Sequence, residues 1–181
     1  MNVIRTEIPD VLILEPKVFG DERGFFLESY NKKAFGEATG LDVEFVQDNH
    51  SSSKRGVLRG LHYQIRHPQG KIVRVTAGEV FDVAVDLRRS SPTFGKTVTF
   101  RLDDSSKRMA WIPPGFAHGF LVVSEHVEFM YKTTDFYAPQ HERTLLWSDP
   151  ALGIRWPIQG EPILADKDRH GTPLKSAETF T

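Results

Sequence analysis

The chain has 181 residues, of which 39% are hydrophobic and 26% are charged, and its 23 basic and 24 acidic side chains leave a formal net charge of −1. This length suits one domain with a core of its own, and the balanced charge excludes a nucleic-acid or membrane binder that works by net charge. The chain has no cysteine, which excludes disulfides, thiolate metal sites and cysteine nucleophiles. Because no apolar run is long enough for a membrane span or a secretion signal, we expect a cytoplasmic protein.

The first predicted elements are a strand over residues 23–28, which follows a turn at residues 21–24, and one short helix. Asn31 is a suitable N-cap for this helix and Gly40 a suitable end. Ala34, Phe35 and Ala38 would form its apolar side.

The middle of the chain alternates apolar and polar residues with a period of two. This pattern predicts strands in residues 72–77, 81–87, 97–102 and 127–132, with turns between them at positions rich in Gly, Pro, Asp and Ser. In the second of these strands, Phe81, Val83, Val85 and Leu87 are expected to face a core.

The C-terminal part is irregular and polar from about Pro157, with a short helical turn expected near Asp166 and a tail over about residues 170–181. Many short strands with few helices indicate an all-β fold of the β-sandwich, jelly-roll or barrel type. We expect a single domain over residues 1–181.

Two segments carry the candidate chemistry. Residues 56–64 read GVLRGLHYQ and residues 111–120 read WIPPGFAHGF. Together they resemble the two half-motifs of the cupin superfamily, whose inward-facing histidines and carboxylate bind a metal. Here the first half offers His62 but has Gln64 in place of a second histidine, and the second half offers His118. Two imidazoles are too few for a transition-metal site, so we predict no metal and rank a metal-dependent cupin oxygenase low.

A histidine that is not a ligand can serve as a base near neutral pH, and His62 is either such a base or a hydrogen-bonded core residue. A buried base needs a carboxylate partner, which the spacing alone does not identify. Several basic residues lie near predicted strand ends and suit an anionic substrate with phosphate groups, namely Arg23, Arg59, Lys71 and Lys167. Arg74 is interpreted as a solvated edge charge.

Further motifs accompany these segments: residues 23–28 (RGFFLE), 45–51 (FVQDNHS), 69–75 (QGKIVRV), 131–134 (YKTT), 141–142 (HE) and 164–168 (LADKD). As a set, the motifs resemble the dTDP-4-dehydrorhamnose 3,5-epimerase family. The resemblance runs from about Arg5 to Pro173 and implies a cupin-type jelly roll, or double-stranded β-helix, with a few short helices.

The resemblance also implies an activity. Members of the family are isomerases that need neither a metal nor another cofactor. They invert C3 and C5 of dTDP-4-dehydro-6-deoxy-D-glucose and give dTDP-4-dehydro-6-deoxy-L-mannose, on the route to dTDP-L-rhamnose and hence to cell-wall polysaccharide or O-antigen. The dTDP-keto-sugar would be the partner of this chain, with no nucleic acid or membrane involved.

Site residues follow from the resemblance position by position. His62 would be the base, Asp168 its partner, Lys71 the group that stabilises the enolate oxygen, and Tyr131 the proton donor on the opposite face. The family's substrate contacts correspond to Arg23, Phe26, Glu28, Gln47, Asn49, Arg59, His118, Glu142 and Lys167. In the family, Arg23, Phe26 and Glu28 come from the partner subunit of a homodimer that exchanges its N-terminal strands.

Two related readings remain open at this point. A relative that epimerises a single carbon, or a ketoisomerase, would use a similar pocket. A sugar-binding cupin without activity is a third reading, against which the presence of both His62 and Tyr131 argues.

Overall fold

The computed structural model describes residues 1–181 and is built mainly from strands in two sheets. The strands are β1 (Asn2–Arg5), β2 (Leu12–Glu15), β3 (Val18–Asp21), β4 (Gly24–Leu27), β5 (Gln47–Lys54), β6 (Leu58–Gln64), β7 (Lys71–Ala77), β8 (Glu79–Asp86), β9 (Thr97–Asp103), β10 (Met109–Ile112), β11 (Phe116–Val122), β12 (His126–Thr133) and β13 (Glu142–Thr144). The α-helices are α1 (Lys32–Thr39) and α2 (Asp166–Arg169), and short 3-10 turns cover Pro139–His141, Pro150–Leu152 and Leu174–Ser176.

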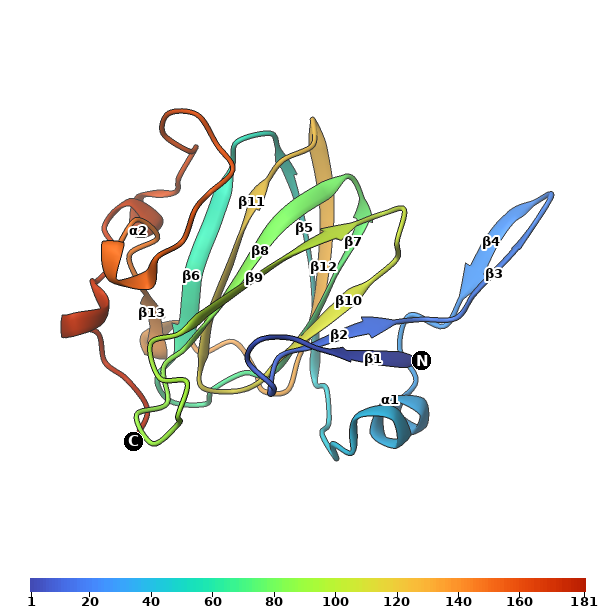
Figure 1. The fold of residues 1–181 in the computed structure, drawn as a ribbon, viewed down its shortest axis with the longest axis horizontal. Helices are drawn as coiled ribbons and strands as arrows, with labels where there is room; N and C mark the ends of the chain where they lie inside the picture. The colour runs from blue at the N-terminus through green and yellow to red at the C-terminus, as the bar shows by residue number, and fades with distance from the viewer.

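The two large sheets face each other and enclose the interior (Figure 1). One has six strands in the order β1-β2-β10-β7-β12-β5, and the other has five in the order β13-β6-β11-β8-β9. All pairings within them are antiparallel. This is the all-β jelly roll that the sequence pattern and the cupin resemblance predict. None of the helices has the length and apolarity that crossing a membrane requires.

The main core lies between the two sheets. Alternate residues of β7, β9 and β12 point into it, as the period of two predicts; for example, Val73, Val98, Val127 and Phe129 are all buried there. Tyr131 packs against the edge of this cluster. The strand pattern therefore identified the inward face of these three strands correctly.

Strand β8 departs from the predicted one-sided pattern, because both of its faces are buried. Val80 and Ala84 belong to the core between the sheets. Val83, Val85 and Leu87 belong to a second cluster outside the sheet, which the C-terminal segment covers with residues such as Leu152 and Ala177. The expectation that the Phe81–Leu87 face points to a core is confirmed, but that core is the outer cluster, and the burial of the opposite face was not expected. Because a distant segment covers the other face, alternation within residues 81–87 could not reveal which side is interior.

The N-terminal elements follow the local signals. The Asn31 side chain accepts a hydrogen bond from the Ala34 backbone N–H and caps α1, and Gly40 ends it in the left-handed conformation with a φ of 74°. Strands β3 and β4 pair only with each other and form a hairpin that projects from the body of the molecule (Figure 1). Phe19, Phe25 and Phe26 of this hairpin are more than half exposed.

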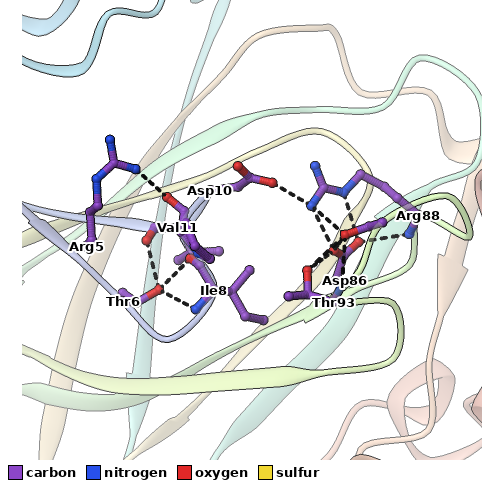
Figure 2. A network of polar contacts seen from close by, with 10 residues as sticks. Arg5, Thr6, Ile8, Asp10, Val11, Asp86, Arg88 and Thr93 are labelled. Carbon is purple, nitrogen blue, oxygen red and sulfur yellow. Dashed lines mark hydrogen bonds and ion pairs between the residues drawn. The ribbon is translucent and has the colours of Figure 1, made fainter.

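A polar network fixes the segment after β8 to the N-terminal loop (Figure 2). The buried Asp86 carboxylate accepts hydrogen bonds from Arg88, Ser91 and Thr93, and Arg88 also donates to Asp10 at 2.8 Å. Burial alone would raise the pKa of Asp86, but these hydrogen bonds, two from the Arg88 side chain and one each from Ser91 and Thr93, lower it to about 2.

The segment predicted as a tail, residues 170–181, packs along the five-stranded sheet. Thr172 bridges to Leu145, and Phe180 bridges to Arg88. Ala177 is buried in the outer cluster. The helix α2, which immediately precedes this segment, lies beside β6.

Candidate active site

A cavity of about 550 Å³ opens between the two sheets. Most of the predicted site residues line it, and they come from six strands and α2: Gln47, Asn49, Arg59, His62, Lys71, His118, Tyr131, Glu142, Lys167 and Asp168. A smaller pocket of about 70 Å³ shares His62, Lys71 and Tyr131 with it. The fold thus brings together residues that are up to 121 positions apart, from Gln47 to Asp168.

His62 on β6 is joined to Asp168 on α2. Its Nε2 atom lies 2.5 Å from Asp168 Oδ1. The Asp168 carboxylate is buried, whereas the His62 side chain retains 24% of its exposure. The carboxylate therefore orients one ring nitrogen, and the ring stays accessible from the cavity. Sequence spacing left this partner open, and the packing of the C-terminal segment supplies it.

His118 on β11 forms a second histidine–aspartate pair with Asp82 on β8. Its Nε2 atom lies 2.9 and 3.1 Å from the two carboxylate oxygens of Asp82, and both side chains are buried. His118 is also directly opposite His62 in the antiparallel pairing of β11 with β6. Directly opposite residues point to the same face of a sheet, so both imidazoles face the cavity.

Two glycines allow β6 and β11 to meet at this point. Gly60 has a φ of 126°, and a Cβ atom there would lie 2.6 Å from Gly119 Cα. A Cβ atom on Gly119 would lie 2.5 Å from the Arg59 carbonyl oxygen. Any larger residue would push the strands apart, so the glycines of the GLH and HGF sequences set the close placement of His62 and His118.

Lys71, at the start of β7, is buried and faces the cavity from the opposite sheet. Burial lowers the pKa of its ammonium group to about 8, while the negative charges of Asp82 and Glu142 work in the other direction. A lysine with this pKa is mostly protonated at pH 7 and can donate a strong hydrogen bond to an oxygen that gains negative charge.

Tyr131 on β12 also comes from the six-stranded sheet. Burial raises the pKa of its phenol, and the positive charges of Lys167 and Arg59 oppose that shift. The hydroxyl is therefore protonated at neutral pH. His62 and Tyr131 line the same cavity from the two opposing sheets, which is the placement that removing and returning a proton on opposite faces of a substrate requires.

The mouth of the cavity is lined by a charged pair and an aromatic ring. Lys167 donates to both oxygens of Glu142, at 2.9 and 3.0 Å. The Tyr137 hydroxyl donates to Glu142 at 3.3 Å, and its ring is half exposed. Sequence reasoning did not single out Tyr137, because a lone aromatic in a loop carries no periodic signal.

Three glutamines hold the loop that carries Tyr137. Gln69 donates to the Asp135 carbonyl, and Gln64 donates to the Phe136 carbonyl and accepts from the Ala138 N–H. Gln47 accepts from the Tyr137 N–H. The amide of Gln64 is thus occupied by the backbone of the protein, which explains a glutamine where a metal-binding cupin has histidine. No three His, Asp or Glu side chains lie in a metal-binding arrangement.

The remaining predicted contacts divide into two groups. Arg59 donates to Ser53 Oγ at 3.0 Å on the cavity wall, and Asn49 accepts from Gln47 at 2.9 Å. By contrast, Arg23, Phe26 and Glu28 lie on or beside the projecting hairpin and do not line the cavity of their own chain. Arg23 pairs instead with Asp21.

Asp82 is the principal site residue that sequence reasoning missed. It lies on the side of β8 that was expected to face away from the core. Its only signal in the sequence is an aspartate between Val80 and Ala84, on what proves to be the interior face.

A family model described as dTDP-4-dehydrorhamnose 3,5-epimerase matches residues 5–176. A protein from Pseudomonas aeruginosa with the same name is 64% identical over 180 residues, which cover 99% of each chain.

Solved structures resemble the whole chain as well. The crystal structure of dTDP-6-deoxy-D-glucose-3,5-epimerase RmlC from Legionella pneumophila, in complex with dTDP-4-keto-L-rhamnose, is 51% identical with a TM-score of 0.95, and the match covers 98% of this chain and 94% of that one. ChmJ, a 3′-monoepimerase from Streptomyces bikiniensis solved with dTDP-quinovose, is 33% identical with a TM-score of 0.89, covering 97% and 88%.

Proposed function

Since the chain belongs to the dTDP-4-dehydrorhamnose 3,5-epimerase family, we propose that His62 and Tyr131 invert C3 and C5 of dTDP-4-dehydro-6-deoxy-D-glucose from opposite walls of the cavity. The protein is an isomerase of dTDP-L-rhamnose biosynthesis. The observation that carries the residue assignment is the placement of His62, paired with Asp168, and Tyr131 on opposing sheets around one cavity.

The substrate makes this chemistry accessible without a redox step. C3 and C5 both lie next to the C4 ketone, so loss of either proton gives an enolate with its charge on the same oxygen. His62 removes the proton, and Asp168 orients the imidazole and stabilises the imidazolium that forms. Lys71 donates to the enolate oxygen from within the cavity.

Inversion requires that the new proton arrive on the other face. The Tyr131 hydroxyl, whose pKa is raised by burial, supplies it and is left as phenolate. His62 then holds one extra proton and Tyr131 lacks one, so the pair must be reset before the second carbon reacts. The partial exposure of His62 allows its proton to exchange with solvent water.

The substrate's dTDP group needs cationic partners. Arg59 and Lys167 lie on the cavity wall and at its mouth, where they suit the diphosphate. Gln47, Asn49, His118 and Glu142 are the further contacts of the same cavity. The glutamine-held loop fixes Tyr137 beside them.

Inversion of one carbon only is the alternative. The similarity to a 3′-monoepimerase means that the fold is compatible with either outcome. Proton NMR of the product after incubation with dTDP-4-dehydro-6-deoxy-D-glucose separates the two, because the H2–H3 coupling constant reports the configuration at C3 and nuclear Overhauser effects from H5 to the other ring protons report the configuration at C5. We expect both centres inverted. A product inverted at one centre would establish the alternative.

The proposal includes a homodimer with shared sites. The β3–β4 hairpin exposes Phe19, Phe25 and Phe26 and has no strand partner in its own chain. An exposed apolar hairpin of this kind suits an interface. In the dimer, Arg23, Phe26 and Glu28 would complete the cavity of the partner subunit.

Mixing two inactive variants tests the shared site. Arg23→Ala and His62→Ala proteins should regain part of the activity when their subunits exchange, because a heterodimer contains one intact site and one doubly damaged site. Subunit exchange is checked by mass spectrometry of the intact dimer. If heterodimers form and activity stays absent, each site is built within one chain.

A further inference from the structure

Gln64 is the last residue of β6, two positions beyond His62, and its side chain is buried. Alternate residues of a strand point to the same face, so the amide lies on the cavity side, where it lines the smaller pocket together with His62 and Tyr137. We propose that Gln64 is a positioning residue for the epimerisation, which joins the loops of residues 65–69 and 135–138 and thereby holds the Tyr137 ring at the cavity mouth.

The amide of Gln64 is bonded to the backbone on both sides of Tyr137. Its Nε2 atom donates to the Phe136 carbonyl at 3.2 Å, and its Oε1 atom accepts from the Ala138 N–H at 2.8 Å. The Tyr137 N–H donates to Gln47 Oε1 at 3.0 Å. The backbone here belongs to no helix or strand, so side-chain amides supply the hydrogen bonds that a neighbouring strand would otherwise supply. The backbone at Tyr137 therefore cannot turn without breaking one of them.

The same amide also reaches the other loop. Its second N–H donates to the His67 carbonyl at 2.7 Å. His67 has a φ of 55°, in the left-handed region that residues with a Cβ atom rarely adopt. Pro68 and Gln69, which follow it, line the smaller pocket. The bond from Gln64 thus secures an unfavourable backbone conformation next to the residues that this loop contributes to the pocket wall.

Gln64 differs from the other contacts that hold these loops. Gln47 and Gln69 line the larger cavity, so a substitution of either would change the surroundings of the substrate directly. The contact of 3.4 Å between His67 Nδ1 and Asp135 joins two solvent-accessible side chains, and exposed ion pairs contribute little. Gln64 is 4% exposed, does not line the larger cavity, and bonds only to backbone groups. It therefore acts through the two loops.

A fixed Tyr137 matters because this residue lies at the cavity mouth. Its ring is half exposed, and its hydroxyl donates to Glu142 at 3.3 Å. An exposed ring on a loose loop would lose conformational freedom when the substrate binds, and that loss weakens affinity. The inference rests on the proposed function, in which Tyr137 lies beside the substrate. Since His62 and Tyr131 lie on strands, loosening the loop should weaken substrate binding more than proton transfer.

The kinetics of Gln64→Met test this role. Methionine has nearly the same length as glutamine but cannot replace the hydrogen bonds of the amide. We expect KM for the dTDP-keto-sugar to rise about tenfold while kcat changes less than about twofold. Deuterium exchange into saturating substrate should continue at close to the wild-type rate. An unchanged KM, or a loss confined to kcat, would overturn the proposal.

Thr97→Val is the matched control. The Thr97 hydroxyl on β9 donates to the Leu152 carbonyl at 3.0 Å, so it also fastens a turn to a strand, and Thr97 lines neither pocket of the site. KM should stay at the wild-type value in this variant. The same rise in KM in Thr97→Val would overturn the proposal, because it would show a general effect of a lost hydrogen bond.

Combination with Tyr137→Ala shows whether Gln64 acts through that ring. Tyr137→Ala should itself raise KM. In that background, Gln64→Met should raise KM by less than about a further twofold, because the two substitutions remove the same contact with the substrate. Increases in KM that multiply in full would overturn the proposal.

Amide hydrogen exchange, measured by NMR without substrate, separates this inference from the proposed function. The Ala138 N–H should be protected in the wild type and lose that protection in Gln64→Met, whatever reaction the enzyme catalyses. Rapid exchange of this amide in the wild type would overturn the proposal, even if Gln64→Met does not fold. A wild type with a protected Ala138 N–H that fails to epimerise the dTDP-keto-sugar would contradict the proposed function and leave the hold of Gln64 on the loop in place.

Discussion

The two histidine–aspartate pairs of the cavity use the same residue types in different surroundings. His62 meets Asp168 across 106 positions of sequence, through one oxygen at 2.5 Å, and its ring is partly exposed. His118 meets Asp82 on the adjacent strand of one sheet, through both oxygens, and both residues are buried. The His62 ring is partly accessible to solvent, whereas both side chains of the second pair are buried.

This difference indicates that a histidine–aspartate pair is not in itself a catalytic signature. The accessible pair suits general base catalysis, because its ring must gain a proton and lose it again in each cycle. The His118–Asp82 pair is buried, so its ring is less accessible for repeated proton exchange than the His62 ring. The predictions below test this division of roles.

The largest effect is expected for His62→Asn. Removing the base should reduce turnover by about 10²–10⁴-fold. It should also stop deuterium exchange at both C3 and C5, since both carbons depend on the same imidazole. His118→Asn should lower activity much less and leave exchange detectable. Steady-state kinetics and NMR of recovered substrate in deuterated water provide both readings.

The assigned roles are contradicted if His62→Asn and His118→Asn lose turnover and deuterium exchange to the same extent. If deuterium exchange is instead lost in His118→Asn and retained in His62→Asn, the roles of the two pairs are reversed. Circular dichroism and binding of dTDP serve as controls that each variant is folded and still holds the nucleotide.

Tyr131→Phe should separate proton removal from inversion. The substitution keeps the ring and removes only the hydroxyl, so His62 can still take a proton and return a solvent deuteron to the same face. We expect inversion to fall roughly 10²-fold while exchange into recovered substrate continues. Mass spectrometry of that substrate measures the exchange, and inversion at the wild-type rate would remove Tyr131 from the mechanism.

The smallest effect concerns a third carboxylate, Asp86, which has a structural role only. Its pKa in the folded protein is about 2, below the ordinary value of 3.8, so the stability it contributes is present above pH 4 and is lost as the pH falls toward 2. Asp86→Asn should lower the free energy of unfolding by about 2 kcal/mol at pH 7.

Urea unfolding of both proteins at pH 7 and at pH 3 measures this difference. The gap between wild type and Asp86→Asn should narrow at the lower pH, and turnover at 25 °C should be equal in the two. A gap that does not depend on pH would show that the Asp86 network stabilises the fold without its charge.

Much of the fold and of the site could be predicted from the sequence. Alternation in β7, β9 and β12 identified their inward residues, and Asn31 and Gly40 marked the ends of α1. The family resemblance named the cavity residues, of which ten line the cavity in the structure. These features depend on local periodicity or on motifs that are contiguous in the chain.

Features that depend on distant packing could not be predicted from local pattern, and the pairing of Asp168 with His62 was expected only from the family resemblance. The C-terminal segment covers the outer face of β8, so that strand is buried on both sides and its pattern misplaced Asp82. The same segment carries Asp168 to His62. Neither contact has a local signal, because both arise only when residues 150–180 fold back on the sheet.

The central claim is that each inverted carbon loses its proton to His62 and receives a new one from Tyr131. Complete conversion of dTDP-4-dehydro-6-deoxy-D-glucose in deuterated water tests it most directly, with the deuterium content of the product read by mass spectrometry and the positions by NMR. The account predicts two deuterium atoms, one at C3 and one at C5, and none in the substrate recovered from His62→Asn. An inverted product that retains its original hydrogen at either carbon would contradict the account.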